Sequence, residues 1–279
     1  MDTPVPSLVP VLIAAYMRAS AARKPGGRTG PFTLGLDAHT DEPMRNYAVP
    51  DSGASPAAGD VAALIEAFRA SQRVPRLEYI EDDAPKAWPA LAASGFTLER
   101  RTPVMIAVAD TPLSPRSPAG IAIRLAASEA DVTAALAVQH RAYEVPYPPG
   151  QPDIDRVTRL TGRGGLLAVA DDEATGEVVG TGLVDVSTDG SAGGPAVAGS
   201  AAAGPDAVAR TVVGEIAAVG VLAGFRRRGI ASALSAYLAR TAHARGIGLV
   251  FLEAEPDEEQ IYRRAGFTDA TTKIWASLR

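Results

Sequence analysis

The stretch EIAAVGVLAGFRRRGIASAL, residues 215–234, decides the expected fold of this chain. An apolar, strand-like segment opens it, and a run with helical periodicity closes it. Between the two stand Arg226, Arg227 and Arg228, directly before Gly229. The first turn of a helix exposes N–H groups and the positive end of the peptide dipoles, so each cation there is unfavourable by roughly 0.3 to 1 kcal/mol. A bound anion reverses that sign, and the loop is therefore interpreted as a phosphate-binding site rather than as a solvated basic turn.

Helices and strands alternate on both sides of this loop. Strand-like patterns occur at residues 121–125, 165–170, 177–186, 215–222 and 249–253, with two closing strands around Phe267 and Ile274. Helical periodicity occurs at residues 128–143, 154–161, 229–245 and 257–264. Together these elements predict an α/β fold, in which a mixed twisted sheet has helices on both of its faces.

The first part of the chain contains a shorter version of the same ending. A helix from Asp60, a strand at 76–80 and a helix at 85–93 precede two expected strands, the last of them at 103–109. The segment AASGF, residues 92–96, also parallels RRAGF near the end of the chain. A duplicated architecture is the simplest account of these parallels.

The first copy lacks the features that carry chemistry in the second. It has DSGASPAAG at residues 51–59 where the second copy has the basic loop, and Leu91 where the second copy has Tyr262. Residues 1–112 are therefore predicted to be a degenerate domain without a cofactor loop, and residues 121–279 the functional domain. A linker is expected at residues 113–120 and a flexible insertion, rich in Gly, Ala and Ser, at residues 187–210.

The composition of the whole chain limits the possible functions. Its 279 residues include 27 basic and 32 acidic side chains, and the net charge of -5 gives no general attraction to nucleic acid or to anionic membranes. Cysteine is absent, which excludes a thiol nucleophile, and the three histidines lack ligand spacing, so no metal centre is expected. The apolar residues 8–16 are too few for a membrane helix and predict a short buried helix in a cytoplasmic protein.

Residues 215–234, together with the later segment YRRAGF at 262–267, resemble the Gcn5-related N-acetyltransferase (GNAT) family. The resemblance is to the family's central strand, its pyrophosphate loop and its closing Y-x-x-x-G-F motif, and these occur in the family's order. It covers residues 121–278, and it extends to the first ~110 residues only at the level of topology. It implies two GNAT-like domains in tandem, of which the second binds acetyl-CoA as co-substrate.

The resemblance also implies which residues hold the cofactor. In the family, the pyrophosphate loop donates backbone N–H groups to acetyl-CoA, and the central strand parts from its neighbour so that the pantetheine arm pairs with its edge. The N–H of Val219 is then expected near the thioester oxygen, where negative charge develops as an amine attacks. The implied cofactor-binding residues are Val219, Gly220, Val221, Arg226, Arg227, Arg228, Gly229, Ile230, Ala231 and Ser232.

Two residues are implied for proton transfer. An alkylammonium acceptor has a pKa near ~10.4 and must lose a proton before it attacks. Glu215, at the start of the central strand, is the candidate base, and Tyr262 matches the tyrosine that protonates the departing thiolate in the family. A solvated carboxylate and a packed aromatic ring are the respective alternatives. One departure from the family is Glu255, which stands where family members usually have an asparagine.

The acceptor side of the site is predicted from the segment after the first helix of the second domain. Tyr143 and Tyr147 fall in the loop that covers the acceptor site in the family, where they either line a pocket or anchor a proline-rich loop. His140, just before this loop, is interpreted as structural.

The sequence thus predicts an enzyme that moves the acetyl group of acetyl-CoA directly to an amine of an unidentified small-molecule or peptide acceptor, as a monomer or a homodimer. The alternative from another class is a noncatalytic acyl-CoA-binding or scaffolding protein. Nucleotide hydrolysis is disfavoured because the chain has no G-x-x-x-x-G-K-[ST] motif. No metal, nucleic acid or membrane is expected to take part.

Overall fold

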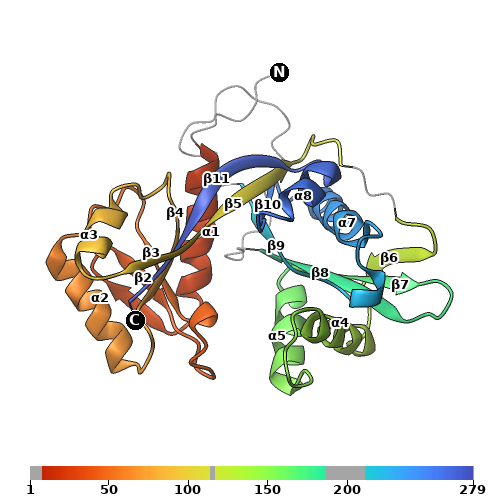
Figure 1. Cartoon of the computed structure of the whole chain (residues 1–279), viewed down its shortest axis with the longest axis horizontal. Helices are drawn as coiled ribbons and strands as arrows, with labels where there is room; N and C mark the ends of the chain where they lie inside the picture. Colours follow the sequence, from red (N-terminus) through yellow and green to blue (C-terminus); the bar gives the residue numbers. More distant parts are fainter. Residues whose placement is uncertain (1–7, 114–116, 187–210, 279) are drawn as a thin grey trace. The chain divides into compact units, whose positions relative to one another are not determined.

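The computed structural model describes residues 8–113, 117–186 and 211–278 of the chain (Figure 1). The predicted insertion and part of the predicted linker lie outside these residues. The described chain divides into two compact units, which are described separately: a first unit of residues 8–104 and 270–278, and a second unit of residues 105–113, 117–186 and 211–269. The domain boundaries given by the sequence stay predictions.

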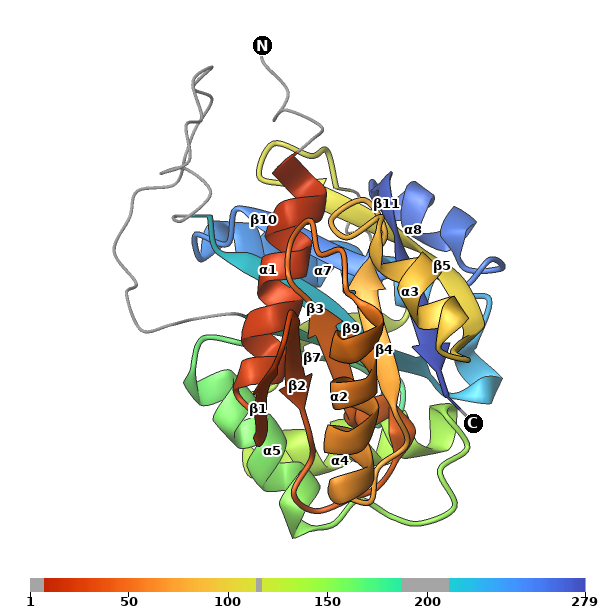
Figure 2. The same ribbon diagram turned by 90° about the vertical axis from the view of Figure 1, so that its left-hand side faces the viewer.

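The first unit is a sheet with helices on both faces (Figure 2). Its helices are α1 (Leu8–Ala22), η1 (Pro43–Arg45), α2 (Ala58–Ala70) and α3 (Ala87–Ala93). Its strands are β1 (Gly26–Thr29), β2 (Phe32–Gly35), β3 (Tyr47–Pro50), β4 (Arg76–Ile80), β5 (Thr97–Val108) and β11 (Thr268–Ser277), in the spatial order β1-β2-β3-β4-β11-β5. β3 and β4 run parallel, whereas β11 and β4 run antiparallel.

Alternating side chains of the first unit's strands decide which helix covers which face. Phe32 and Leu34 of β2 join Leu64 and Phe68 of α2 in one core. Gly35, the residue after Leu34, lies on the other side, where a Cβ atom would come within 2.8 Å of the Cα of Ala21 in α1. Glycine is needed there because α1 packs directly onto the strand, and α1 therefore covers the face opposite α2 and α3.

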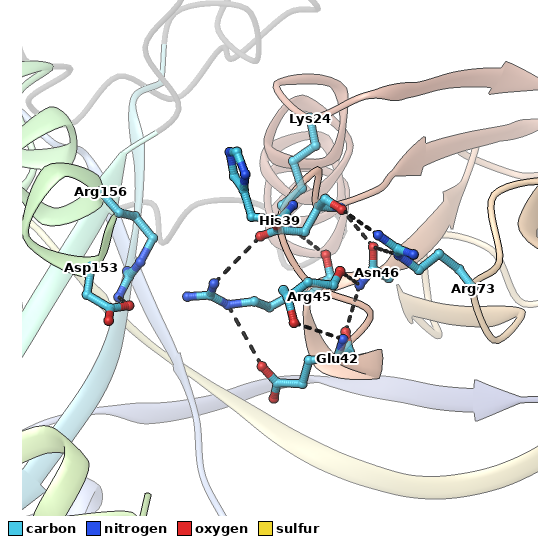
Figure 3. A network of polar contacts seen from close by, with 10 residues as sticks. Lys24, His39, Glu42, Arg45, Asn46, Arg73, Asp153 and Arg156 are labelled. Carbon is cyan, nitrogen blue, oxygen red and sulfur yellow. Dashed lines mark hydrogen bonds and ion pairs between the residues drawn. The ribbon is translucent and has the colours of Figure 1, made fainter. Parts of the chain in front are cut away.

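The loop between β2 and β3 is held by a buried amide (Figure 3). Asn46 is 1% exposed, and its Oδ1 accepts the N–H of Asp37 at 2.8 Å. Its Nδ2 donates to the carbonyl oxygens of Thr40 at 3.0 Å and Glu42 at 2.8 Å. Arg73 donates to the same Oδ1 at 3.3 Å. Because donors and acceptor of this amide are all used within the loop, we interpret the network as structural.

The second unit is a mixed sheet that matches the α/β arrangement expected for residues 121–279. Its helices are α4 (Glu129–Ala142), α5 (Gln151–Gly162), η2 (Ala223–Phe225), α7 (Ile230–Ala244) and α8 (Glu259–Ala265). Its strands are β6 (Ile121–Leu125), β7 (Leu166–Asp172), β8 (Val178–Val186), β9 (Val213–Val221) and β10 (Leu249–Glu253). The order is β10-β9-β8-β7-β6, with the end of β5 beside β10, and only β9 and β10 are parallel among the registered pairs.

Helices cover both faces of the second unit's sheet. Leu234 and Leu238 of α7 pack with Ile216 and Val184 on one face. Leu136 and Val157, from α4 and α5, pack with other strand residues in a separate core on the opposite face. The predicted mixed sheet with helices on both faces is therefore confirmed.

Two details of the prediction are wrong. Two short strands were expected after Gly95, but β5 is one strand of 12 residues. Two closing strands were expected around Phe267 and Ile274, but β11 is one strand of 10 residues. Both strands contribute residues to both units, and the last part of β11 lies between β4 and β5 in the sheet of the first unit.

The apolar segment near the start of the chain forms a helix, as expected. α1 begins at Leu8 and buries Ile13, Ala14, Tyr16 and Met17 among other residues. In the part of the chain that the structure describes, none of the helices has the length and hydropathy to cross a membrane.

Candidate active site

The pairing of the two parallel strands in the middle of the second unit ends before β9 does, because β10 stops at Glu253. β9 and β10 are in register from Val213 opposite Leu249 to Ile216 opposite Leu252, and the register ends there. β9 itself continues to Val221. Within the described residues, the last part of β9 has no registered partner on the β10 side, and such a backbone edge can hydrogen-bond an extended ligand.

A β-bulge lies in this last part of β9. Leu183 of β8 faces Ala217, but Thr181, two residues away, faces Gly220, so β9 has one extra residue. The bulge is at Ala218, whose φ of 55° lies in the left-handed region that a non-glycine residue rarely adopts. The bulge reverses the alternation, since Ala217 and Ala218 both pack on the α4 side and Val219 packs on the α7 side.

The end of α4 is pressed against this bulge. A Cβ atom on Gly220 would lie 3.0 Å from the Cβ of Ala142, which explains why this strand position is glycine. Tyr143 follows α4 directly, and its hydroxyl donates to the carbonyl oxygen of Val219 at 3.2 Å. The predicted acceptor residue Tyr143 and the predicted cofactor residue Val219 are therefore in contact.

The basic loop leads into α7 through a glycine in the left-handed conformation. Gly229 has a φ of 84° and is the residue before the first turn of α7, where it provides no side-chain cap. The first turn also contains no acidic residue. Ile230, Ala231 and Ser232 thus form a helix start without a carboxylate or a hydroxyl cap, and such a start favours an anion.

The three arginines of the loop have different surroundings. Arg226 is anchored to backbone carbonyl groups: its Nε donates to Val221 at 3.1 Å and its Nη2 to Ala142 at 3.0 Å. Arg227 and Arg228 are exposed, and the guanidinium of Arg228 lies 5.2 Å from the centre of the Phe225 ring. Arg226 therefore connects the loop to the end of α4, and Arg227 and Arg228 are the cations with open surroundings.

The candidate acid Tyr262 is buried in α8. It is 6% exposed, and its ring meets Phe267 edge to face with 6.3 Å between the ring centres. Burial raises the pKa of Tyr262, and the nearby charges of Glu258 and Tyr143 raise it further. The hydroxyl is therefore protonated at neutral pH, as a proton donor must be.

The candidate base Glu215 lies in the paired part of β9. It faces Phe251 on one side and Asp185 on the other, and Asp185 forms an ion pair with Arg163 at 2.6 Å. Its alternation with Ala217 puts Glu215 on the α4 side of the sheet. It stands four residues before Val219, which is about 13 Å along a strand.

The loop after α4 is anchored by His140. Its Nδ1 lies 2.9 Å from the carbonyl oxygen of Tyr147, and the two rings meet edge to face with centres 5.7 Å apart. These contacts fit the structural role expected for His140. Tyr147 is 63% exposed, and its part in acceptor binding stays a prediction.

Sequence reasoning missed two features of this region. The anchoring of Arg226 by Ala142 joins residues far apart in the chain, and no local pattern indicates it. Glu258, one helical turn before Tyr262, was also missed, although its spacing of four residues from the candidate acid was a usable signal.

The mixed sheet with its bulged strand β9, together with helix α7 that begins after Gly229, has the arrangement of the GNAT acetyltransferase fold. Residues 133–267 match the family model described as Acetyltransferase (GNAT) family. The matched segment contains β9, the basic loop, α7 and Tyr262. Residues 133–267 therefore match a GNAT-family acetyltransferase domain, which supports that part of the expected resemblance.

Solved structures support the same fold over more of the chain. The chain is similar to a GCN5-related N-acetyltransferase from Kribbella flavida, with 23% identity, a TM-score of 0.73 and coverage of 96% of this chain and 95% of that one. A second one, from Sphaerobacter thermophilus, has 21% identity and a TM-score of 0.59 over 79% of this chain and 67% of that one. A tandem GNAT protein from the clavulanic acid biosynthesis pathway has 15% identity and a TM-score of 0.57 over 88% of this chain and 77% of that one. Among curated proteins, none matches the sequence.

Proposed function

We propose that the second unit binds acetyl-CoA and transfers its acetyl group directly to an amine. The supporting observation is the start of α7, which has no side-chain cap and no acidic residue and lies beside the open edge of β9. An anion at that helix start and an extended arm along that edge together fit a molecule with a diphosphate and a pantetheine chain. The family to which the domain is matched supports the same co-substrate.

We propose that the bulge of β9 orients the N–H of Val219 toward the thioester oxygen. The left-handed Ala218 directly before it changes the direction of this peptide group relative to a regular strand. A donor fixed in this way stabilises the negative charge that develops as the amine attacks, without reorganisation during the reaction. Tyr143, which binds the carbonyl group of the same residue, would hold it in place.

In this proposal Tyr262 donates a proton to the departing thiolate, and a carboxylate accepts the proton of the incoming ammonium. The raised pKa of Tyr262 keeps its hydroxyl protonated until the thiolate forms. Glu215 is the carboxylate that the family resemblance indicates. Because it lies within the paired part of β9, it suits proton transfer through water rather than direct contact with the amine.

We also propose that the first unit is a GNAT-like copy without a cofactor site. Its run of β3, α2, β4 and α3 has the same order as β9, α7, β10 and α8, and β3 and β4 are parallel as β9 and β10 are. The likeness to a tandem GNAT protein supports this proposal.

The rival proposal is a noncatalytic acyl-CoA-binding protein. The test measures the binding of CoA by calorimetry and the release of free CoA from acetyl-CoA with a panel of amines. Binding together with amine-dependent release, reduced in Tyr262→Phe, is expected. Binding without turnover in any amine, unchanged by Tyr262→Phe, favours the rival, and the absence of binding heat contradicts both.

A further inference from the structure

Glu258 stands four residues before Tyr262, at the start of α8. Glu258 has helical backbone angles, φ -96° and ψ -19°, and α8 begins directly after it. Its carbonyl oxygen accepts the N–H of Ile261 at 2.8 Å and that of Tyr262 at 3.3 Å. Side chains four residues apart lie on the same face of a helical turn. The carboxylate of Glu258 and the phenol of Tyr262 therefore share one face.

The hydroxyl of Tyr262 is open toward a ligand. The residue is 6% exposed, and within residues 8–113, 117–186 and 211–278 no group hydrogen-bonds its hydroxyl. The ring accounts for this burial, whereas the hydroxyl oxygen is not one of the fully buried side-chain atoms that lack a partner. The missing partner is consistent with a site that a bound molecule completes.

The charge of Glu258 acts on tyrosines of two elements, Tyr143 after α4 and Tyr262 in α8. The Tyr143 side chain, after α4, is 54% exposed overall, but shielding of its hydroxyl and the charge of Glu258 both raise the pKa of Tyr143. Burial raises the pKa of Glu258, and the charges of Asp257 and Glu255 raise it further. A backbone hydrogen bond with Glu255 acts in the opposite direction and lowers it. Among the described residues, no cation contributes to these values, and none forms an ion pair with Glu258.

A half-buried carboxylate without a positive partner is unfavourable unless a ligand supplies one. The ligand of an amine acetyltransferase arrives as an ammonium ion, because the pKa of an alkylammonium is near ~10.4. We infer that Glu258 binds the ammonium group of the acceptor and accepts its proton, and that the acceptor is a cationic alkylamine. This inference rests on the proposed acetyl transfer.

The ammonium gives one proton to the Glu258 carboxylate, and the free amine attacks the thioester carbonyl carbon. The C–S bond breaks with its electron pair on sulfur, and Tyr262 protonates the thiolate to give CoA with a free thiol. The nitrogen of the new amide loses its second proton, which returns to the Tyr262 phenolate. Glu258 releases its proton to solvent, so the net products are the amide, CoA and one proton.

The position of Glu258 suits this role better than that of Glu215. Glu258 shares a helical face with the proton donor Tyr262. Glu215 instead lies in the part of β9 that pairs with β10. Tyr143 links the two sides, since it binds Val219 and its pKa responds to Glu258. The acceptor nitrogen would thus lie between the carboxylate and the open end of β9.

The charge around Glu258 also restricts the class of acceptor. Asp257 and Glu255 add negative charge near Glu258, so a second positive charge on the acceptor is favoured and a carboxylate is repelled. Cadaverine and ε-aminocaproate are suitable probes, because each has a primary amine on a five-carbon chain and they differ in the charge at the far end. The full-length protein is expected to acetylate cadaverine with a kcat/KM about tenfold or more higher.

The decisive variant is Glu258→Gln, with Asp257→Asn as the matched control. Both remove one negative charge, but only the first removes the proposed base. Glu258→Gln is expected to lower kcat with cadaverine by about 100-fold and to leave CoA binding in calorimetry unchanged. Asp257→Asn is expected to raise the KM for cadaverine but to change kcat less than about threefold, because it weakens attraction of the acceptor and leaves the proposed base in place. An equal loss in both variants would indicate a general field effect and overturn the assignment.

The dependence of kcat/KM on pH distinguishes a proton-accepting Glu258 from a purely structural one, because only the former changes the pH profile. Because burial raises the pKa of Glu258, the acid limb of kcat/KM is expected above the ordinary value for Glu, near ~4.3, and Glu258→Gln should lose this limb. If Glu215→Gln loses the limb and Glu258→Gln retains it, Glu215 is the base and the inference is wrong. Binding of CoA without acetylation of any amine by the unmodified protein would instead contradict the proposed function.

Stability provides an independent check of the same charge. The folded state disfavours the charged form of Glu258, so stability is lost as the pH rises through its raised pKa. Glu258→Gln should therefore melt at a higher temperature than the unmodified protein at pH 7, and at the same temperature near pH 4. A lower melting temperature at both pH values would mean that the carboxylate has a structural partner, and it would overturn the inference.

Discussion

The two units of the chain each have a parallel strand, a loop and a helix in the same order, but they treat the start of that helix differently. In the first unit, Asp60 lies in the first turn of α2, and its carboxylate accepts the N–H of Ala57 at 2.8 Å. In the second unit, the corresponding turn of α7 has no acidic residue and no side-chain cap. One helix start thus contains its own anion, and the other is left for an external one.

The loops before these helices differ in the same way. In the first unit, Gly53 donates its N–H to the carbonyl oxygen of Asp83 at 2.7 Å, and Ser52 donates to the carboxylate of Asp83 at 2.8 Å. Asp83 also pairs with Arg18 at 2.7 Å. The loop after β9 instead contains the exposed Arg227 and Arg228. A strand-loop-helix frame therefore becomes a binding site only where its polar groups are not satisfied internally.

The helices after β4 and β10 show the same contrast. Leu91 and Ala87 of α3 are 0% exposed and pack in an apolar core. The corresponding residues of α8 and the turn before it are Tyr262 and Glu258. Each of the following variants makes one unit resemble the other at a single position.

The largest effect is expected from Tyr262→Leu, which copies Leu91 into the second unit. Loss of the proposed proton donor should lower kcat by about 100-fold to 1000-fold, with little change in the dissociation constant of CoA. Steady-state kinetics and calorimetry measure the two quantities. Tyr262→Phe is the control that keeps the ring against Phe267, and full activity in this control would show that the hydroxyl takes no part.

Ser232→Asp copies the capping carboxylate of α2 into α7, because both residues are third in their helix. The new charge should stabilise the helix start and occupy the place proposed for the diphosphate, so acetyl-CoA should bind about 100-fold more weakly while the melting temperature rises. The matched control is Ser232→Asn, which has the same shape without the charge. Unchanged affinity in Ser232→Asp would disprove phosphate binding at this helix.

Removal of single arginines should separate charge from anchoring. Arg228→Ala is expected to weaken acetyl-CoA binding by about tenfold and to raise the melting temperature of the unliganded protein slightly, because it removes an exposed cation near the start of α7. Arg226→Ala should instead lower the melting temperature, because its guanidinium binds the carbonyl groups of Val221 and Ala142. Identical melting and binding in the two variants would show that the anchoring seen for Arg226 has no energetic weight.

The smallest effect is expected in the first unit. Asp60→Ala removes the reciprocal contact at the start of α2 and should lower the free energy of unfolding by about 1 kcal/mol. Acetyl transfer should be unaffected, since the proposed cofactor site is in the second unit. Urea denaturation and steady-state kinetics test the two parts, and a loss of activity without a loss of stability would give the first unit a direct role in catalysis.

Local patterns were sufficient for much of this fold. Helical periodicity and the terminating Gly246 place α7 at Ile230–Ala244, close to the expected 229–245. The alternation of apolar residues likewise indicates the strands on both sides of the basic loop. These features depend on neighbours in the sequence, and the propensities of those neighbours agree with the tertiary structure.

Features that depend on distant residues were not predictable. The bulge at Ala218 is set by packing against both α4 and α7, and its local signal is limited to Gly220, two positions later in the strand. The contact of Arg226 with Ala142 and the pairing of β11 with β4 likewise join residues far apart in the sequence. The proposed site residues were chosen by family resemblance, and their roles await the measurements described above.

The pairing of β11 with β4 bears on how this protein is made. Ala276 is opposite Leu77, about 200 positions earlier in the chain, and β11 separates β4 from β5 in the first unit's sheet. On the ribosome, domains usually fold in the order in which they are synthesised. Here the sheet of the first unit cannot be completed until β11 has been translated, so a nascent chain that has not yet reached Thr268 holds the four described helices and five described strands of this unit without one of its central strands.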